Sequence, residues 1–238
     1  MGIRKAHVTG TNERTGGSPA SRPRRPRRDA EANRERLLAA AVSAMLREGR
    51  NVPLAAIAAE AGVGVGTLYR KYPDRQALMH ALEHRAYDLL VRVLEEIEEL
   101  ECPGRRAIGE YLTRCLEVRD QLVLPLRGAP PLMTAEAVRA RRTINRMLDA
   151  FLARGRSDGT IRAGVNATDV IVFTTLITQS PPYGPDWRLL AHRQIAIFLG
   201  ALAGDGPADL PGPEITPDDV EEAFAAQAAR TAGGRDPS

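Results

Sequence analysis

The stretch Val52–Leu78, VPLAAIAAEAGVGVGTLYRKYPDRQAL, decides the fold of this chain. Its first half has the apolar spacing of one helical face, at Leu54, Ile57 and Ala58. Gly62 ends that helix, because glycine enters the left-handed conformation after a helix without steric strain. A second helix is predicted from Val65 to Tyr72, with Leu68 on its buried side. Two helices joined by a short glycine-containing turn form a helix-turn-helix, whose second helix enters the DNA major groove.

The run from Ile57 to Leu78 resembles the DNA-binding signature of the TetR family of bacterial transcriptional regulators. The matching positions are Ile57, Ala58, Ala61, Gly62, Val63, Gly66, Leu68 and Tyr69, and Tyr72 replaces the usual phenylalanine. The resemblance covers about Arg34 to Leu90. It implies an all-α fold, in which an N-terminal three-helix helix-turn-helix head is joined by a long fourth helix to a C-terminal helical body for ligand binding and dimerisation. Pro53 departs from the family, which commonly has serine or threonine there.

By this resemblance the start of the second helix, from Gly64 to Gly66, faces the base edges of DNA. Val65 can contact a thymine methyl group, while Arg70 and Lys71 suit the phosphate backbone. Arg75, at the start of the fourth helix, adds a phosphate contact. The predicted DNA-binding residues of the head are Val65, Gly66, Thr67, Tyr69, Arg70, Lys71 and Arg75.

Basic residues crowd the first thirty-six positions, although the net charge of the chain is only +3. Residues 1–28 contain almost nothing apolar and are expected to be a disordered, arginine-rich arm. Extended arginines suit the narrow minor groove or the phosphate backbone, so the arm is predicted to bind DNA. The alternative is a solubilising tail with no specific role. The arm residues assigned to DNA are Arg24, Arg25, Arg27 and Arg28.

The remaining organisation follows from helical periodicity and from breaks at proline and glycine. We expect the DNA-binding domain at 29–75, the effector-binding and dimerisation domain at 76–203, and a loose acidic tail at 204–238 with one short helix starting near Thr216. Helices are expected at 74–100, 105–122, 134–154 and 187–202. Thr168–Gln179 contains a β-branched run that fits a strand or a helix. We predict a helix capped by Thr168, since no partner strand exists elsewhere.

A body of this kind is expected to hold a small-molecule effector of unknown identity and to form a homodimer. The effector pocket is assigned to Tyr111, Cys115, Met147, Phe151 and Phe173. The last two body helices are more apolar than one buried face requires, and surplus apolar surface marks an interface. By resemblance they pair with their copies, through Phe173, Ile177, Ile195, Phe198, Leu199 and Leu202. Two recognition helices then match a palindromic operator in double-stranded DNA.

Composition and motifs favour a regulator over an enzyme. The two cysteines, Cys102 and Cys115, have no metal-ligand spacing and are expected to be buried and reduced. His80 and His84 share a helical face but lack a third ligand, so we assign no metal, no cofactor and no catalytic residue. The sequence has no membrane-spanning run and no signal peptide, which indicates a cytoplasmic protein. The alternatives are a helical-bundle enzyme and a non-specific DNA-binding protein that carries a helix-turn-helix.

Overall fold

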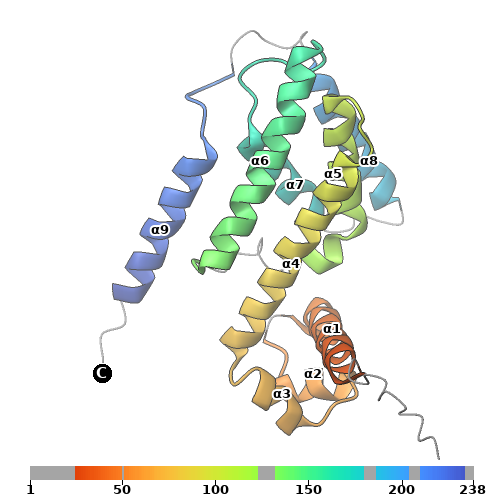
Figure 1. The fold of residues 1–238 in the computed structure, drawn as a ribbon, viewed down its shortest axis with the longest axis vertical. Coiled ribbons are helices and arrows are strands. Elements are labelled where there is room, and N and C mark those ends of the chain that lie inside the picture. Colours follow the sequence, from red (N-terminus) through yellow and green to blue (C-terminus); the bar gives the residue numbers. More distant parts are fainter. Residues whose placement is uncertain (1–24, 50, 123–131, 180–185, 204–209, 234–238) are drawn as a thin grey trace, which may run out of the picture. The chain divides into compact units, whose positions relative to one another are not determined.

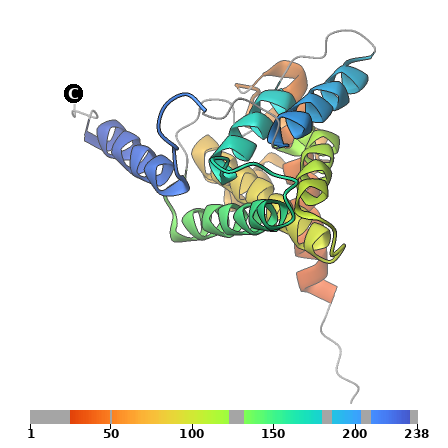
Figure 2. The same ribbon diagram turned by 90° about the horizontal axis from the view of Figure 1, so that it is seen from above.

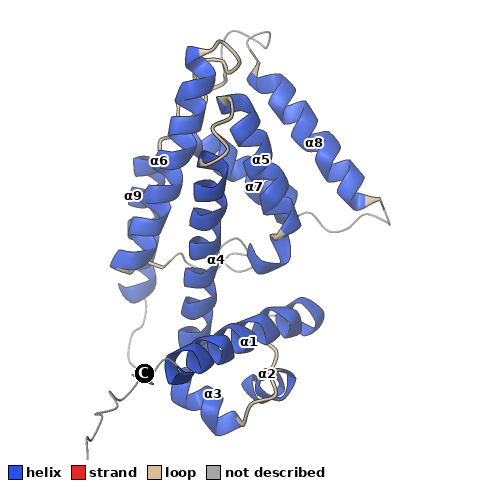
Figure 3. Ribbon diagram, turned by 45° about the vertical axis from the view of Figure 1, so that its right-hand side comes forward, coloured by secondary structure: helices blue, strands red, loops and turns tan. Residues whose placement is uncertain are grey.

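The computed structural model describes residues 25–49, 51–122, 132–179, 186–203 and 210–233. Every regular element within these ranges is helical, as predicted (Figure 3). In chain order (Figure 1) the elements are α1 (Arg25–Glu48), α2 (Leu54–Glu60), α3 (Val65–Lys71), α4 (Arg75–Glu98), α5 (Gly104–Glu117), the 3-10 helix η1 (Arg119–Leu122), α6 (Ala135–Ser157), α7 (Ala167–Gln179), α8 (Trp187–Leu202) and α9 (Pro217–Gly233).

The chain divides into two compact units, residues 1–35 and 36–238. The described part of the first unit is the beginning of α1, where Arg34 pairs with Glu31 one turn earlier at 3.3 Å. The second unit contains the rest of α1 and all other elements, and the domain boundary expected after residue 75 lies inside it. Each unit is therefore described by itself.

The second unit has two separate clusters of buried side chains. The head cluster joins α1–α3 to the start of α4 and consists of Leu37, Leu38, Ala41, Val42, Ala44, Met45, Val52, Leu54, Ile57, Ala58, Leu68, Tyr72, Leu78 and Leu82. The body cluster is built from α4 to α8 and has Leu112, Leu148 and Phe151 at its fully buried centre. Each buried leucine or phenylalanine contributes about 1.5–3 kcal/mol through the hydrophobic effect.

Helix α4 is the element that the two clusters share. Leu78 and Leu82, near its N-terminus, belong to the head cluster, and Leu94 and Ile97 belong to the body cluster. Asp74 caps the helix, because its carboxylate accepts from the backbone N–H of Ala77 at 2.7 Å. A single continuous helix therefore connects the two clusters.

Helices α5 and α6 meet at two glycines that leave no room for a side chain. A Cβ atom on Gly104 would lie 2.1 Å from the carbonyl oxygen of Phe151, and one on Gly155 would lie 2.4 Å from Ile161. The helix expected at 134–154 continues to Ser157, so Gly155 lies inside α6 and does not turn the chain. The turn comes at Gly159, which has a φ of +73°.

Replacing Gly104 with alanine is expected to destabilise the fold by at least about 2 kcal/mol, because the added methyl group overlaps backbone atoms that cannot rotate away. Gly109→Ala, in the same helix, is the matched control, since its methyl group meets only the end of the Leu199 side chain at 3.1 Å. Urea denaturation measures both variants. Equal stability of the two would show that the α5–α6 contact is not tight.

The structure corrects three local predictions about where helices begin or end. Helix α1 starts at Arg25, so the last residues of the expected arm are helical; arginine is a good helix former, and proline is tolerated in a first turn. Helix α7 is capped by Asn166, not Thr168. The Asn166 side chain accepts from two backbone N–H groups, and Asp169 reciprocates at the Asn166 N–H at 3.0 Å. The predicted helix at 105–122 is α5 followed by η1.

The C-terminal tail is also more ordered than expected. Thr216 and Asp219 form a reciprocal cap, which agrees with the predicted start, but α9 continues to Gly233. The hydrogen bonds from Thr216 lower the pKa of Asp219. Helix α9 lies beside α6 at the margin of the helices of the body (Figures 1 and 2), where Glu221 pairs with Arg141 of α6. The short helix expected within the tail is therefore present, as residues 217–233.

Candidate DNA-binding surface and effector pocket

The turn between α2 and α3 has the predicted geometry. Gly62 has a φ of +67°, and the N–H of Val63 donates to Ala58 at 3.0 Å, which closes the end of α2. Leu68 is fully buried in the head cluster and Tyr72 is nearly so, as predicted. Because these two side chains fix the rotation of α3 about its axis, the opposite side of α3 is turned toward solvent.

The predicted contact residues of α3 lie on that solvent side. Val65 is 42% exposed and Tyr69 is 48% exposed. Gly66, Arg70 and Lys71 are exposed as well, and Thr67 is half-buried. A Cβ atom on Gly66 would meet nothing within 4 Å, so the space above this glycine is open. The exposed face of α3 therefore combines apolar contact, donors and two cations.

Arg75 has a different place from the one expected. Its guanidinium donates to the backbone carbonyl groups of Val52 and Asn51, the second at 3.4 Å, and so holds the loop before α2 against the start of α4. The role of Arg75 at phosphate remains a prediction. Arg24 lies outside the described residues, and the backbone of Arg25, Arg27 and Arg28 lies in the first turn of α1.

An ion pair that sequence analysis missed attaches α2 to α1. Arg47 donates to both carboxylate oxygens of Glu60, at 3.0 Å and 2.7 Å. These hydrogen bonds lower the pKa of Glu60 to about 2. The pair lies at the surface, so it fixes the orientation of α2 more than it stabilises the fold.

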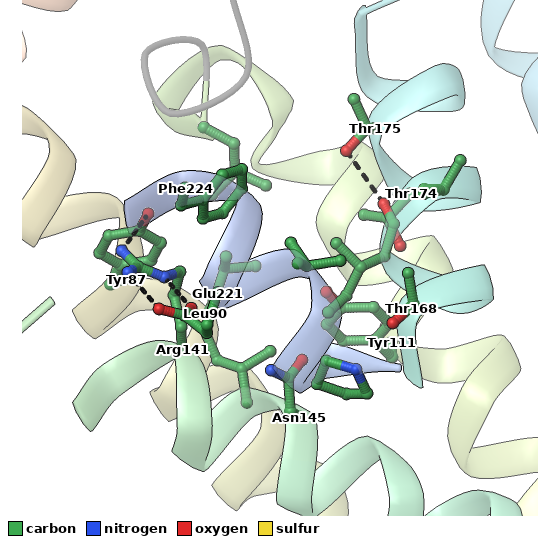
Figure 4. A pocket seen from close by; sticks show the side chains of 16 residues that line it. Tyr87, Leu90, Tyr111, Arg141, Asn145, Thr168, Thr174, Thr175, Glu221 and Phe224 are labelled. Carbon is green, nitrogen blue, oxygen red and sulfur yellow. Dashed lines mark hydrogen bonds and ion pairs between the residues drawn. The ribbon is translucent and has the colours of Figure 1, made fainter. Parts of the chain in front are cut away.

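The body contains a pocket of about 280 Å³ between α4, α5, α6, α7 and α9. Figure 4 shows Tyr87, Arg141 and Glu221 on one side of it and Tyr111, Thr168 and Thr174 on the other. Its lining is mainly apolar, with Leu90, Leu122, Ile144, Ile171, Val172, Val220 and Phe224. The hydroxyl oxygen of Thr168 is buried in the described structure without a hydrogen-bond partner. A pocket with an apolar wall and a few polar groups is typical of a small-molecule site.

Of the five residues assigned to the effector pocket, Tyr111 alone lines this cavity. Cys115 and Phe151 are fully buried in the body cluster, and burial raises the pKa of the Cys115 thiol to about 12. Met147 is half-buried beside the same cluster, and Phe173 stacks on Phe198 with ring centroids 4.0 Å apart. Apolar periodicity identified residues of the core, but it could not distinguish those that border a cavity.

A buried polar network forms the charged side of the pocket. The Glu83 carboxylate accepts from the Tyr87 hydroxyl and from the Leu132 N–H, each at 3.0 Å. Arg141 donates to the Leu132 carbonyl at 2.8 Å. It also forms a bidentate ion pair with Glu221, in which Nη2 lies 2.7 Å from Oε2 and Nε contacts Oε1. Burial, with the Glu83 charge beside it, raises the pKa of Tyr87, so this phenol remains a donor.

Sequence analysis did not identify this network, although one signal was available. Arg141 lies four residues after Ala137 and three before Ile144, which places it on the buried face of α6, and it is 8% exposed. A buried arginine requires an anionic partner. Its partner, Glu221, lies 80 positions further along the chain, and no local pattern connects the two.

The predicted dimer residues divide between the core and its edge. Ile177, Ile195 and Leu202 are buried within the protomer, which corrects their assignment to an interface. Phe173, Phe198 and Leu199 are half-buried. Other apolar residues of these helices are exposed: Val172 and Leu176 on α7, and Leu189, Leu190, Ala196, Ile197 and Ala201 on α8, of which Leu190, Ile197 and Ala201 share one face. Both helices are apolar on several sides, so periodicity alone selected the stripe that faces the core.

Each of the two histidines on α4 has a polar neighbour of its own. The His80 ring lies 3.5 Å from the Gln76 amide, and the His84 ring lies 3.4 Å from the Thr134 hydroxyl. No group of three potential metal ligands occurs among the residues that the structure describes. The cysteines are both free and buried, as expected. Within the described ranges, no helix is both long enough and apolar enough to cross a bilayer.

A head with an exposed recognition helix, joined by α4 to a body with a pocket, defines a regulator of the helix-turn-helix class. Residues 37–82 match the family of bacterial regulatory proteins described as the tetR family. Residues 37–82 therefore carry the helix-turn-helix DNA-binding domain of the TetR family.

Individual relatives agree with this assignment. An HTH-type transcriptional regulator of Staphylococcus aureus is 31% identical over 102 residues, which are 41% of this chain and 53% of that protein. This chain thus spans about half the length of that curated relative. A TetR transcriptional regulator from Streptomyces coelicolor superposes with a TM-score of 0.54 at 28% identity and covers 73% of this chain and 99% of its own. A TetR transcription regulatory protein from Mycobacterium vanbaalenii superposes with a TM-score of 0.54 at 27% sequence identity. The superposition covers 74% of this chain and 98% of that protein.

Proposed function

We propose that this protein is a repressor that binds a palindromic operator as a homodimer and releases it when a small molecule enters the body pocket. The exposed face of α3 carries the proposal. Leu68 fixes α3 in the head cluster, so Val65, Tyr69 and Arg70 are exposed on the opposite side, where none of the described residues covers them. Groups of this kind on a helix-turn-helix suit the major groove and its phosphates.

Direct base contacts by this helix are few, because two of the three residues from Gly64 to Gly66 have no side chain. Val65 contacts a thymine methyl, and the open space at Gly66 lets the DNA approach closely. Arg70 and Lys71 bind phosphates. Arg24, Arg25, Arg27 and Arg28 add affinity by releasing counterions, whatever the sequence of the site.

The exposed stripes of α7 and α8 support the dimer. Leu176 is 62% exposed and Ile197 is 61% exposed. On α8, Leu190, Ile197 and Ala201 follow the spacing i, i+7, i+11, which places them on one face. A second copy of this chain covers these stripes across a two-fold axis. The two α3 helices then reach half-sites about 34–36 Å apart.

Helix α4 couples the pocket to the head. Tyr87 lines the pocket and bonds to Glu83 of the same helix, while Leu78 and Leu82 belong to the head cluster. Thirteen residues, about 20 Å of helix, separate Tyr87 from the cap at Asp74. A ligand that changes the contacts of Tyr87 shifts α4 and thereby the spacing of the two heads.

Selection from random DNA duplexes tests the DNA-binding part of the proposal. We expect the purified protein to enrich sequences with two inverted half-sites one helical turn or more apart. Protection of one such duplex from nuclease then gives the site size. Retention of all duplexes to the same extent would favour a non-specific DNA-binding protein over a repressor.

The paired substitution Arg70→Ala/Lys71→Ala is expected to weaken binding to selected and unselected duplexes by the same factor. Phosphate contacts fix the position of a protein on DNA but carry little sequence information. Losing both lowers the slope of log K against log salt concentration by about 2. Arg142→Ala/Arg146→Ala is the matched control, because replacing these two exposed arginines of α6 removes the same amount of charge from the body. A loss confined to the selected duplex, with the slope unchanged, would contradict the assignment.

A further inference from the structure

The pocket has one pair of opposite charges in an otherwise neutral lining. Of its described lining residues, Arg141 and Glu221 alone carry a charge. The cavity beside the pair is bordered by aliphatic and aromatic side chains from α4, α6, α7 and α9. A ligand that fills this space therefore has an apolar part, and its polar end meets Arg141 and Glu221 (Figure 4).

The two sides of the Arg141 guanidinium are held in different ways. One nitrogen donates to the Leu132 carbonyl at 2.8 Å and lies 3.5 Å from the Tyr87 hydroxyl, so it is fixed by the core of the body. The other edge is directed at the two carboxylate oxygens of Glu221. This planar fork matches any carboxylate, whether it belongs to the protein or to a ligand.

Glu221 comes from the element that is least attached to the body. None of the described α9 side chains belongs to the buried core. Besides the ion pair, the Arg141 guanidinium lies over the Phe224 ring at 5.5 Å, Pro217 and Val220 border the pocket, and before the helix the Asn166 amide donates to the Ile215 carbonyl at 2.9 Å. Elements with few buried apolar contacts open at low free energy. Helix α9 can thus leave the pocket if Arg141 keeps an anionic partner.

A buried arginine without an anion is strongly unfavourable, so an uncharged ligand cannot replace Glu221. We propose that the pocket binds an apolar carboxylate, whose carboxyl group displaces Glu221 from Arg141 and thereby releases α9. The ligand's apolar part occupies the cavity between Leu90, Ile144 and Ile171. With about 280 Å³ available, the pocket fits acids at the small end of the range of bound ligands. This inference rests on the proposed ligand-responsive function and names its ligand class.

The test uses the full chain without DNA and compares straight-chain acids, from hexanoate to dodecanoate, with the alcohols of the same length. Calorimetry is expected to show that at least one acid binds tenfold or more tightly than its alcohol. Hydrogen exchange of the amides at 217–233 is expected to rise with the acid and to remain unchanged with the alcohol. Equal affinity of each acid and its alcohol would overturn the proposal, and so would the absence of binding by every acid.

Two variants separate competition from simple charge attraction. Glu221→Gln removes the competing carboxylate, so acid affinity is expected to rise about tenfold while alcohol affinity stays the same. Glu222→Gln, an exposed neighbour on α9, is the control that loses the same charge without effect. Arg141→Met/Glu221→Met removes both charges together and should abolish the preference for acids. Weaker acid binding by Glu221→Gln would show that Glu221 assists the ligand and would overturn the displacement.

The outcome of this test is independent of operator binding, because none of the binding or exchange experiments contains DNA. If acids displace α9 but the operator complex survives, the inference stands and the proposed release mechanism fails. If operator release is instead caused by an uncharged molecule while α9 stays protected from exchange, the proposed function stands and this inference is overturned.

Discussion

Ile197→Glu is expected to convert the proposed dimer to a monomer and to lower operator affinity by a factor of about 10²–10⁴, because the second head is no longer held at a high effective concentration on the same duplex. Ile197 lies on the exposed stripe of α8 and is 61% exposed in the protomer. A glutamate there is solvated in the monomer but is buried without a partner in the dimer. Sedimentation velocity and titration of the selected duplex measure the two effects.

Two controls give this result its meaning. Ala153→Glu adds the same charge at an exposed position of α6 and should change neither the oligomeric state nor the affinity. Ile195→Glu, on the buried side of α8, should instead lower the thermal midpoint of the protein itself, because its side chain lies in the body cluster. A dimeric Ile197→Glu protein with full operator affinity would place the interface elsewhere.

The head could be predicted from the sequence because its determinants are local. Gly62, Leu68 and Asp74 each act within a few residues, through a left-handed turn, a buried anchor and a cap. The helix at 167–179 was also predicted correctly against its β-branched composition, since the absence of a partner strand decided the matter. Signals of this kind depend on neighbours along the chain, and the sequence contains them in full.

The pocket could not be predicted because its determinants are distant in sequence. Arg141 and Glu221 are 80 positions apart, and Glu83 and Leu132 are 49 apart. Thr168 was expected to cap α7. Asn166, two residues earlier, supplies the cap instead, and Thr168 borders the cavity. Arg75 shows the same limitation, since its bond to the Val52 carbonyl spans 23 positions. Whether a side chain meets DNA, a cavity or its own backbone depends on such contacts.

Glu83→Ala is expected to destabilise the fold by about 3 kcal/mol, because two buried donors lose a charged acceptor and each unsatisfied group is unfavourable by about 1–3 kcal/mol. These donors are the Tyr87 hydroxyl and the Leu132 N–H, and Glu83 itself is only 6% exposed. Glu83→Gln keeps an acceptor oxygen and should lose about 1 kcal/mol. Asp88→Ala, at an exposed position of the same helix, should have little effect.

Urea denaturation decides the comparison, and a Glu83→Ala loss no larger than that of Asp88→Ala would show that the network contributes nothing. The variant also tests the role of α4. Glu83 follows Leu82 of the head cluster and bonds to Tyr87 of the pocket, which in turn lies within 3.5 Å of Arg141. Where the variant is still folded, we expect operator affinity without ligand to persist and ligand-dependent release to weaken. Without Glu83, Leu132 and the Arg141 guanidinium bound to it lose one hydrogen-bonded connection to α4.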